Sequence, residues 1–252
     1  AFAMASPLTA AKQQLRRVVK QRLATVSQDA ILAQSHTIFE TLVHFKPYQD
    51  ASRISVFLSM PVGEIQTDAI VRHALSSGKQ VFVPYLHKSP LHEPGAPARV
   101  MDMVRLRDIQ DYDGLERDAW GIPSIDPATV HQRQRILGGS ADGPESGEST
   151  LDLILVPGVA FDTDDAGYVR RLGHGKGFYD FFLNRYLAAK AHGEAGGGPV
   201  LRFYGLALTE QLLEPARDEP VPMGRYDRGL HGLILGDGEI KLSPDAQSIS
   251  AP

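Results

Sequence analysis

The chain has 252 residues, no cysteine and a formal net charge of −4. The absence of cysteine excludes disulfide bonds and thiolate metal sites, and it fits a reducing compartment. The 26 basic and 30 acidic residues lack the positive excess that is typical of nucleic-acid-binding proteins. No apolar run reaches the roughly 20 residues of a membrane span, and no secretory signal is visible. We therefore expect a cytoplasmic α/β protein that binds neither nucleic acid nor membrane, and a mitochondrial location stays open.

The first predicted helix begins with an N-cap, Ser6, followed by Pro7 at the first helical position. Lys12, Arg16 and Lys20 recur three to four residues apart on one face of this helix. From their spacing alone, these cations are typical of a solvated basic face. Another face carries an apolar stripe that predicts packing against a core, formed by Leu8, Ala11, Leu15, Val18, Val19 and Leu23.

Helix starts and short apolar runs alternate along the rest of the chain. Ser27, Thr67 and Phe178 stand at the starts of predicted helices, and Thr209 stands at the start of a short one. Strands are predicted between them at residues 53–60, 81–85, 100–106, 151–156, 201–208 and 233–235. Because several of these strands are apolar throughout, we expect a mostly parallel sheet that is covered on both faces.

We expect residues 1–252 to form one domain and to act as a monomer. Residues 1–5 are interpreted as a cloning remnant followed by a disordered start. Two stretches rich in Gly, Ser, Asp and Glu, residues 138–150 and 191–198, are predicted to be flexible insertions. Residues 241–252 are expected to form a frayed tail.

The most informative stretch is a glycine-rich loop that follows the apolar strand at residues 151–156. Ala160-Phe161-Asp162 and a polar turn come first, and glycines then occupy alternate positions at Gly173, Gly175 and Gly177. Glycine lets a backbone approach a ligand closely, and the first N–H groups of the helix from Phe178 favour an anion. Arg171, His174 and Lys176 add positive charge, so the loop is predicted to bind phosphate, although a tight strand-to-helix turn fits its spacing as well.

The longer string around this loop resembles the signature of the 5-formyltetrahydrofolate cyclo-ligases, also called methenyltetrahydrofolate synthetases. The matching runs are Asp152-Leu153-Ile154-Leu155-Val156-Pro157-Gly158-Val159-Ala160-Phe161-Asp162 and Arg171-Leu172-Gly173-His174-Gly175-Lys176-Gly177-Phe178-Tyr179-Asp180. The resemblance implies a three-layer α/β/α fold related to sugar-phosphate isomerases and CoA-transferases. It also implies that ATP drives the cyclisation of 5-formyltetrahydrofolate to 5,10-methenyltetrahydrofolate through a phosphorylated formyl group.

The resemblance carries over residue by residue to a site for two substrates and Mg²⁺. Lys12-Gln13-Gln14-Leu15-Arg16 resembles a family pattern whose lysine and arginine contact the ATP phosphates. The implied ATP site comprises Lys12, Arg16, Arg171, Gly173, His174, Gly175, Lys176, Gly177, Phe178 and Tyr179. The implied catalytic residues are Arg171, His174 and Lys176. The implied folate site comprises Phe57, Met60, Glu64, Trp120, His174, Gly175, Lys176, Gly177 and Phe178. The implied Mg²⁺ ligands are Asp180 and Asp227.

Two other functions stay open at this point. A sugar-phosphate isomerase on a related fold would need a phosphate loop and a base but no ATP. Lys12 and Arg16 beside a glycine loop argue against it. A folate-binding regulatory module without catalysis stays open because the sequence departs from the family pattern. His174 stands where many relatives have arginine, Phe178 replaces a common tyrosine, and His231 replaces a common aspartate.

Overall fold

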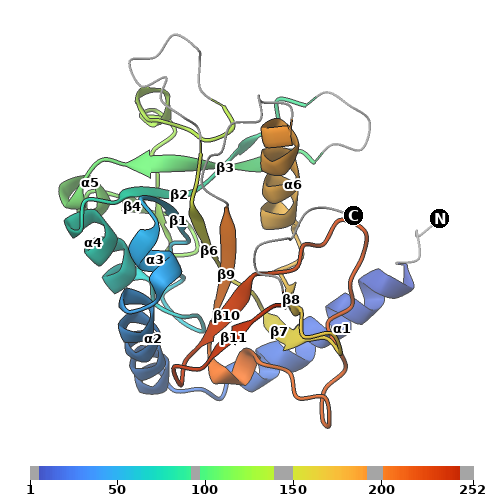
Figure 1. Ribbon diagram of the computed structural model, residues 1–252. Coiled ribbons are helices and arrows are strands. Elements are labelled where there is room, and N and C mark those ends of the chain that lie inside the picture. The colour runs from blue at the N-terminus through green and yellow to red at the C-terminus, as the bar shows by residue number, and fades with distance from the viewer. Residues whose placement is uncertain (1–5, 92–96, 139–149, 192–200, 245–252) are drawn as a thin grey trace.

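A computed structural model describes residues 6–91, 97–138, 150–191 and 201–244. Its centre is a seven-stranded sheet in the order β11-β10-β9-β6-β1-β2-β3 (Figure 1). The neighbours from β10 to β2 are parallel, and the edge strands β11 and β3 are antiparallel to theirs. The predicted mostly parallel sheet is therefore confirmed. Its strands are β1 (Arg53–Val56), β2 (Gln80–Lys88), β3 (Arg99–Leu106), β6 (Leu153–Val156), β9 (Arg202–Ala207), β10 (Gly232–Leu235) and β11 (Ile240–Leu242).

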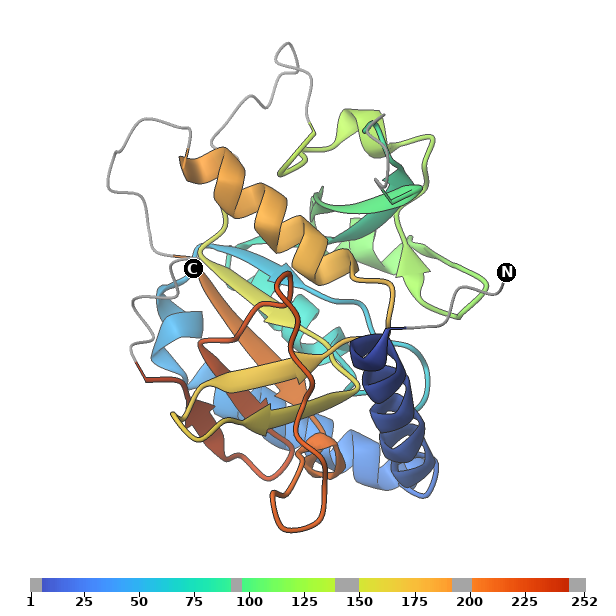
Figure 2. The same ribbon diagram turned by 90° about the vertical axis from the view of Figure 1, so that its right-hand side faces the viewer.

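Helices cover both faces of the sheet, because alternate residues of each strand point to opposite sides. In β6, Leu153 and Leu155 join the core cluster under α2 and α4, whereas Ile154 and Val156 join the cluster under α6. Figures 1 and 2 show these helices on opposite sides, which confirms the three-layer α/β/α arrangement. The helices are α1 (Pro7–Leu23), α2 (Gln28–Val43), α3 (Lys46–Asp50), α4 (Asp68–Ser76), α5 (Ile109–Asp113) and α6 (Phe178–Ala191), with 3-10 turns at η1 (Val130–Gln132) and η2 (Thr209–Gln211).

The strand predicted over residues 53–60 ends at Val56 instead. Just beyond it, the Thr67 hydroxyl donates to the Phe57 carbonyl at 2.7 Å, and the Met60 N–H donates to the Glu64 carboxylate at 2.9 Å. Side chains of the following turn thus satisfy backbone groups that a neighbouring strand would otherwise use. Thr67 directly precedes α4, but its hydroxyl is directed to Phe57 and makes no capping hydrogen bond to the helix. Ser6 and Ser27, by contrast, cap α1 and α2 as predicted.

An antiparallel hairpin that the sequence did not predict links the sheet to α6. It consists of β7 (Ala160–Thr163) and β8 (Val169–Leu172). Its apolar side chains, Ala160 and Leu172, pack with Leu15 and Val19 of α1 in a third core cluster. Figure 2 shows α1 lying beside this hairpin. The hairpin therefore fixes where the basic face of α1 lies.

The predicted frayed tail is wrong at its start. Lys241 and Leu242 belong to β11, which pairs with β10. The Ser243 hydroxyl continues the contact by donating to the Leu230 carbonyl at 2.6 Å. The predicted insertions lie outside the described residues except at their edges. In the described part of the chain, no helix combines the length and the hydropathy needed to cross a bilayer.

Candidate active site

The glycine loop, residues 173–177, joins the end of β8 to the start of α6. Gly175 and Gly177 have φ values of 102° and 68°, a left-handed conformation that other residues rarely adopt. The first helical hydrogen bond runs from the Phe181 N–H to the Gly177 carbonyl at 2.9 Å, which leaves earlier N–H groups of α6 free for a ligand. The loop therefore presents exposed backbone donors at the positive end of a helix, as the phosphate prediction requires.

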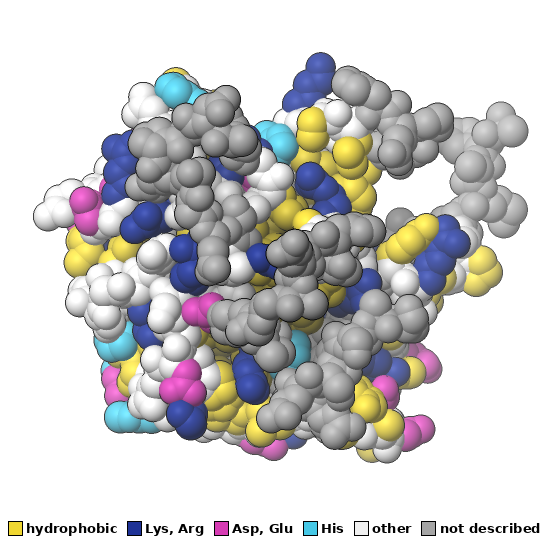
Figure 3. Space-filling model, turned by 45° about the horizontal axis from the view of Figure 1, so that its top comes forward, with side chains coloured by type: hydrophobic (Ala, Val, Ile, Leu, Met, Phe, Trp, Pro, Cys, Tyr) yellow, Lys and Arg dark blue, Asp and Glu magenta, His cyan; other side chains and the backbone are white. Residues whose placement is uncertain are grey.

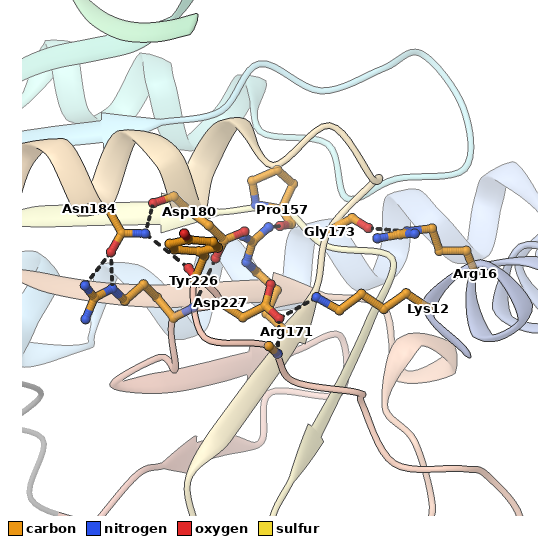
Figure 4. Close-up of polar contacts among 11 residues, drawn as sticks. Lys12, Arg16, Pro157, Arg171, Gly173, Asp180, Asn184, Tyr226 and Asp227 are labelled. Atoms are coloured by element: carbon orange, nitrogen blue, oxygen red, sulfur yellow. Dashed lines mark hydrogen bonds and ion pairs between the residues drawn. The ribbon is translucent and has the colours of Figure 1, made fainter. Parts of the chain in front are cut away.

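Helix α1 brings its basic face onto this loop. Arg16 Nε donates to the Gly173 carbonyl at 2.7 Å, and a Cβ at Gly175 would lie 3.3 Å from the Arg16 guanidinium (Figure 4). The packing of Leu15 and Val19 against the β7–β8 hairpin turns Arg16 and Lys12 toward the same side. The first helix and the glycine loop, which lie far apart in the sequence, thus form one cationic site.

Lys12 forms an ion pair with Asp227 at the edge of this site (Figure 4). Asp227 also accepts a hydrogen bond from the Gly224 N–H at 2.6 Å, so the loop that carries it is tied to its own backbone. The structure therefore brings the predicted ATP-binding lysine and one predicted metal ligand into direct contact.

Arg171 is held as a structural cation as well as lying near the glycine loop. Its guanidinium donates to Asp180 at 2.8 Å and to the Pro157 carbonyl at 3.1 Å, and the residue is only 7% exposed. Asp180 also accepts from the Arg228 N–H at 3.1 Å. Arg171 and Asp180 thus tie β8 to the first turn of α6, and both predicted site residues are engaged with each other (Figure 4).

Glu64 and His174 face each other across the opening of the loop. His174 Nε2 lies 3.8 Å from Glu64 Oε1. Burial raises the pKa of Glu64, which is 8% exposed, to about 7. The pKa of His174 is lowered by burial and then by the nearby cations Lys20, Arg171 and Arg16. Burial thus weakens the charged form of both side chains.

The remaining predicted residues divide between the surface and the core. Lys176 is exposed and forms no ion pair with any residue that the structure describes, so its ammonium is available to a ligand. Phe57 is 3% exposed and belongs to the core under α2 and α4, where it contributes packing. Trp120 is 75% exposed. Met60, Phe178 and Tyr179 are partly buried, and Phe178 and Tyr179 pack against the core cluster under α6.

Trp120 lies in a short hairpin beside the loop that follows β1. The hairpin pairs β4 (Glu116–Arg117) with β5 (Pro123–Ser124). A Cβ at Gly121 would lie 2.7 Å from Pro61 Cγ, which shows how closely the two segments approach. The predicted folate residues Met60, Glu64 and Trp120 are thus gathered on one side of the glycine loop.

Sequence reasoning missed the polar residues that support this site. Asn184, one turn along α6, donates to the Asp180 carbonyl at 2.8 Å and to the Tyr226 carbonyl at 3.1 Å (Figure 4). Its amide oxygen accepts from the Arg228 guanidinium. Asn184 thereby joins α6 to the loop that carries Asp227. Its place four residues after Asp180, on the same helix face, was the available signal.

His231, which departs from the family pattern, is a buried structural residue. Its Nδ1 accepts a hydrogen bond from the Phe203 N–H at 3.0 Å, and its ring packs edge-on against Phe203. Accepting that bond requires a neutral imidazole, and burial lowers the pKa of His231 to about 4. The imidazole thus supplies the acceptor for the start of β9.

This burial makes the stability of the protein depend on pH. Below pH 6.5 the unfolded chain binds a proton at His231 that the folded chain excludes, so stability falls as the pH drops toward 4. Between pH 7.5 and 5, His231 should account for a loss of about 2 kcal/mol. His231→Asn keeps a side-chain acceptor but removes the titration. Urea unfolding at both pH values should therefore give a smaller pH difference for the variant, and an equal difference would reject this explanation.

A mostly parallel α/β/α fold with a glycine loop at a helix N-terminus is an arrangement typical of α/β proteins that bind phosphate. A sequence profile of the 5-formyltetrahydrofolate cyclo-ligase family matches residues 8–231. The chain belongs to this family of enzymes.

Known relatives agree with this assignment. A Caenorhabditis elegans protein named "Probable 5-formyltetrahydrofolate cyclo-ligase" is 35% identical over 93% of this chain and 96% of its own length. The mouse 5-formyltetrahydrofolate cyclo-ligase is 34% identical over 71% of this chain and 76% of its own. In fold, the chain is similar to the solved 5,10-methenyltetrahydrofolate synthetase of Aquifex aeolicus. That likeness has a TM-score of 0.58 at 22% identity and covers 95% of this chain and 96% of the other.

Proposed function

We propose that this protein uses MgATP to convert 5-formyltetrahydrofolate to 5,10-methenyltetrahydrofolate, releasing ADP and phosphate. The observation that carries the proposal is the docking of Arg16 on the glycine loop, with Lys12 one helical turn away. This arrangement gives one cationic cradle for phosphates beside a separate side lined by Met60, Glu64 and Trp120. The cradle suits ATP, and the other side suits the pterin and its formyl group.

The reaction explains why cations and backbone donors suffice. A formyl amide is a poor electrophile, so its oxygen first takes the γ-phosphoryl group of ATP. The N10 amine then attacks the formyl carbon, and phosphate leaves. No protein nucleophile is needed, because the protein positions two substrates and stabilises developing charge on the phosphoryl group. Lys176, Arg16 and the N–H groups of the glycine loop are assigned to this stabilisation.

Arg171 receives a different role from the one implied by the family signature. Its guanidinium is occupied by Asp180 and the Pro157 carbonyl, so it holds the glycine loop and α6 in register. His174 is assigned to the folate side because it faces Glu64. These assignments keep both residues at the site while limiting direct phosphate contact to Lys12, Arg16 and Lys176.

The net charge and the one face drawn in Figure 3 favour small-molecule substrates over a polyanionic partner. On the face in Figure 3, the Lys and Arg side chains outside the grey regions are dispersed among hydrophobic, acidic and uncharged residues. The chain as a whole carries a net charge of −4. We expect the protein to be a monomer and to act in the cytoplasm.

Mg²⁺ is assigned to Asp227 and Asp180. The described residues contain no cluster of three or more His, Asp or Glu side chains around a metal position. A nucleotide-bound Mg²⁺ needs only one or two carboxylates, however, with phosphate oxygens and waters completing its shell. Asp227 fits, because Oδ2 accepts from Lys12 and Gly224 while Oδ1 forms no hydrogen bond to the described residues. Both carboxylate oxygens of Asp180 already accept hydrogen bonds, from Arg171 and from the Arg228 N–H, so Asp180 can bind Mg²⁺ only if one of these bonds breaks. When bound, Mg²⁺ neutralises phosphate charge.

A magnesium titration checks these two ligands. At saturating ATP and folate, Asp227→Ala and Asp180→Ala should each need much more Mg²⁺ for half-maximal turnover, or lose turnover. Each variant removes a carboxylate that Mg²⁺ prefers over other ligands. Asp237→Ala, which removes an exposed carboxylate beyond β10, is the control. If both site variants keep the Mg²⁺ dependence of the parent, the metal assignment is wrong.

Lys12 and Arg16 should affect ATP more than the folate. A hydrogen bond to a charged group contributes about 1.5–3 kcal/mol, so Lys12→Gln with Arg16→Gln should raise the KM for ATP by tenfold or more. Steady-state kinetics with each substrate varied in turn measures the difference. Arg17→Gln is the matched control, because Arg17 is exposed and bonds to Gln14 within α1. Equal changes in the two KM values would favour a purely structural role.

The function itself is tested by mixing the protein with MgATP and 5-formyltetrahydrofolate. The proposal expects the absorbance of the methenyl product to grow together with ADP, in equal amounts. If the methenyl product forms without any ADP, ATP is not a substrate of the reaction. Binding of the folate without any product would favour the regulatory module, and turnover of a sugar phosphate would favour the isomerase.

A further inference from the structure

One carboxylate at the glycine loop lacks the cationic partner that its neighbours have. Asp180 pairs with Arg171, and Asp227 pairs with Lys12. Within the described residues Glu64 forms no ion pair with Lys or Arg. Its Oε2 accepts the Met60 N–H at 2.9 Å, and its Oε1 has only His174 nearby, at 3.8 Å. Glu64 is therefore fixed by its backbone contact but is free at the oxygen that faces the site.

The groups that face Glu64 do not compensate for its burial. His174 approaches from the glycine loop, and burial together with Lys20, Arg171 and Arg16 lowers its pKa. Tyr179 approaches from α6, and burial raises its pKa, so its phenol stays neutral. Neither neighbour carries a charge at neutral pH that would hold Glu64 ionised. A buried carboxylate without a countercharge gains affinity for protons.

We propose that Glu64 is the general base of ring closure, which takes the proton that N10 loses. This inference rests on the proposed function. The N10 lone pair forms the new bond to the phosphorylated formyl carbon, and N10 becomes positively charged. Glu64 Oε1 removes its proton, and the N–H electron pair returns to nitrogen. The carbon–oxygen bond then breaks, its electron pair leaves with phosphate, and the amidinium of the methenyl product remains.

The other titratable groups at the site are poorer acceptors. Asp180 and Asp227 are already engaged in ion pairs with Arg171 and Lys12. Protonating His174 would place a positive charge among Lys20, Arg171 and Arg16. When Glu64 accepts the proton, its carboxylate becomes a neutral carboxylic acid, so no positive charge is added beside these cations. A base is most efficient when its pKa lies near the working pH, and the pKa of Glu64 is about 7.

The first test separates phosphoryl transfer from ring closure in a single turnover. Glu64→Gln keeps an acceptor for the Met60 N–H but cannot take a proton at neutral pH. Rapid-quench measurement of ADP and stopped-flow absorbance of the methenyl product are followed with MgATP and 5-formyltetrahydrofolate. We expect ADP to form at nearly the parent rate and ring closure to slow by about 10²–10⁴-fold. A binding or structural role would instead slow both steps together, and that result would overturn the proposal.

The second test changes the proton affinity of Glu64 by substituting its neighbour His174, while Glu64 itself stays in place. The kcat/KM for the folate, at saturating MgATP, should fall below about pH 7 in the parent. His174→Arg puts a permanent cation beside the carboxylate, which should move this acid limb down by roughly one pH unit or more. His174→Gln adds no charge and should leave the limb in place. Identical limbs in all three proteins would overturn the proposal.

The two failures are distinguishable. If the parent protein makes neither ADP nor methenyl product, the proposed function fails. If the parent is active and Glu64→Gln closes the ring at the parent rate, only the assignment of Glu64 fails.

Discussion

Replacing Arg171 with methionine should destabilise the protein by about 3–5 kcal/mol, because it leaves a partly buried carboxylate without its cation. Arg171 is 7% exposed, and its partner Asp180 accepts from it at 2.8 Å. The same change also removes the hydrogen bond to the Pro157 carbonyl, which links the end of β6 to β8. Urea unfolding with and without the substitution measures the loss.

Two controls identify the cause of that loss. Arg225→Met removes an exposed arginine that lies over the Tyr226 ring, and it should change stability by no more than about 0.5 kcal/mol. In the double variant Arg171→Met/Asp180→Asn, the unpaired charge is gone. Its destabilisation should therefore be smaller than the sum of the two single effects. Additive single effects would show that Arg171 and Asp180 act independently.

Lys176→Ala should reduce turnover by about ten- to a hundredfold while the fold stays intact. Lys176 is exposed between two glycines at the start of α6, so its removal alters no packing. A charged hydrogen bond in a shielded complex contributes about 1.5–3 kcal/mol, which corresponds to that range of rates. Steady-state kinetics and a melting curve measure both properties. Lys190→Ala, at the other end of α6, is the control. Unchanged kinetics for a folded Lys176→Ala would reject its role.

The layers of the fold could be predicted because the burial of a central strand is visible in the apolar residues of its own sequence. In β6 every residue from Leu153 to Val156 is buried, and the sequence shows this as an unbroken apolar run. Strand β8 gives a weaker signal, since Arg170 and Arg171 occupy its centre. Both arginines are paired with carboxylates, Arg170 with Asp162 and Arg171 with Asp180. Asp180 lies on another element, so local patterning could not reveal the hairpin.

The candidate site shows the same division between local and distant information. The glycine loop was recognisable from its spacing, and the family signature added Lys12 and Arg16 on a distant helix. The partners of these cations were not predictable in this way: Lys12 and Asp227 are 215 residues apart in sequence. Only the packing of α1 on the β7–β8 hairpin brings them together. The burial of Glu64, from which its proton affinity follows, likewise depends on the whole fold.

Following the formyl oxygen tests the central claim most directly. In the proposed reaction that oxygen attacks the γ-phosphorus of ATP and then leaves the folate as part of phosphate. With 5-formyltetrahydrofolate labelled by ¹⁸O in the formyl group, each phosphate released during MgATP-dependent turnover should carry one ¹⁸O, which mass spectrometry detects. Unlabelled phosphate accompanied by full formation of the methenyl product would contradict the account, because ATP would then have been cleaved without activating the formyl group.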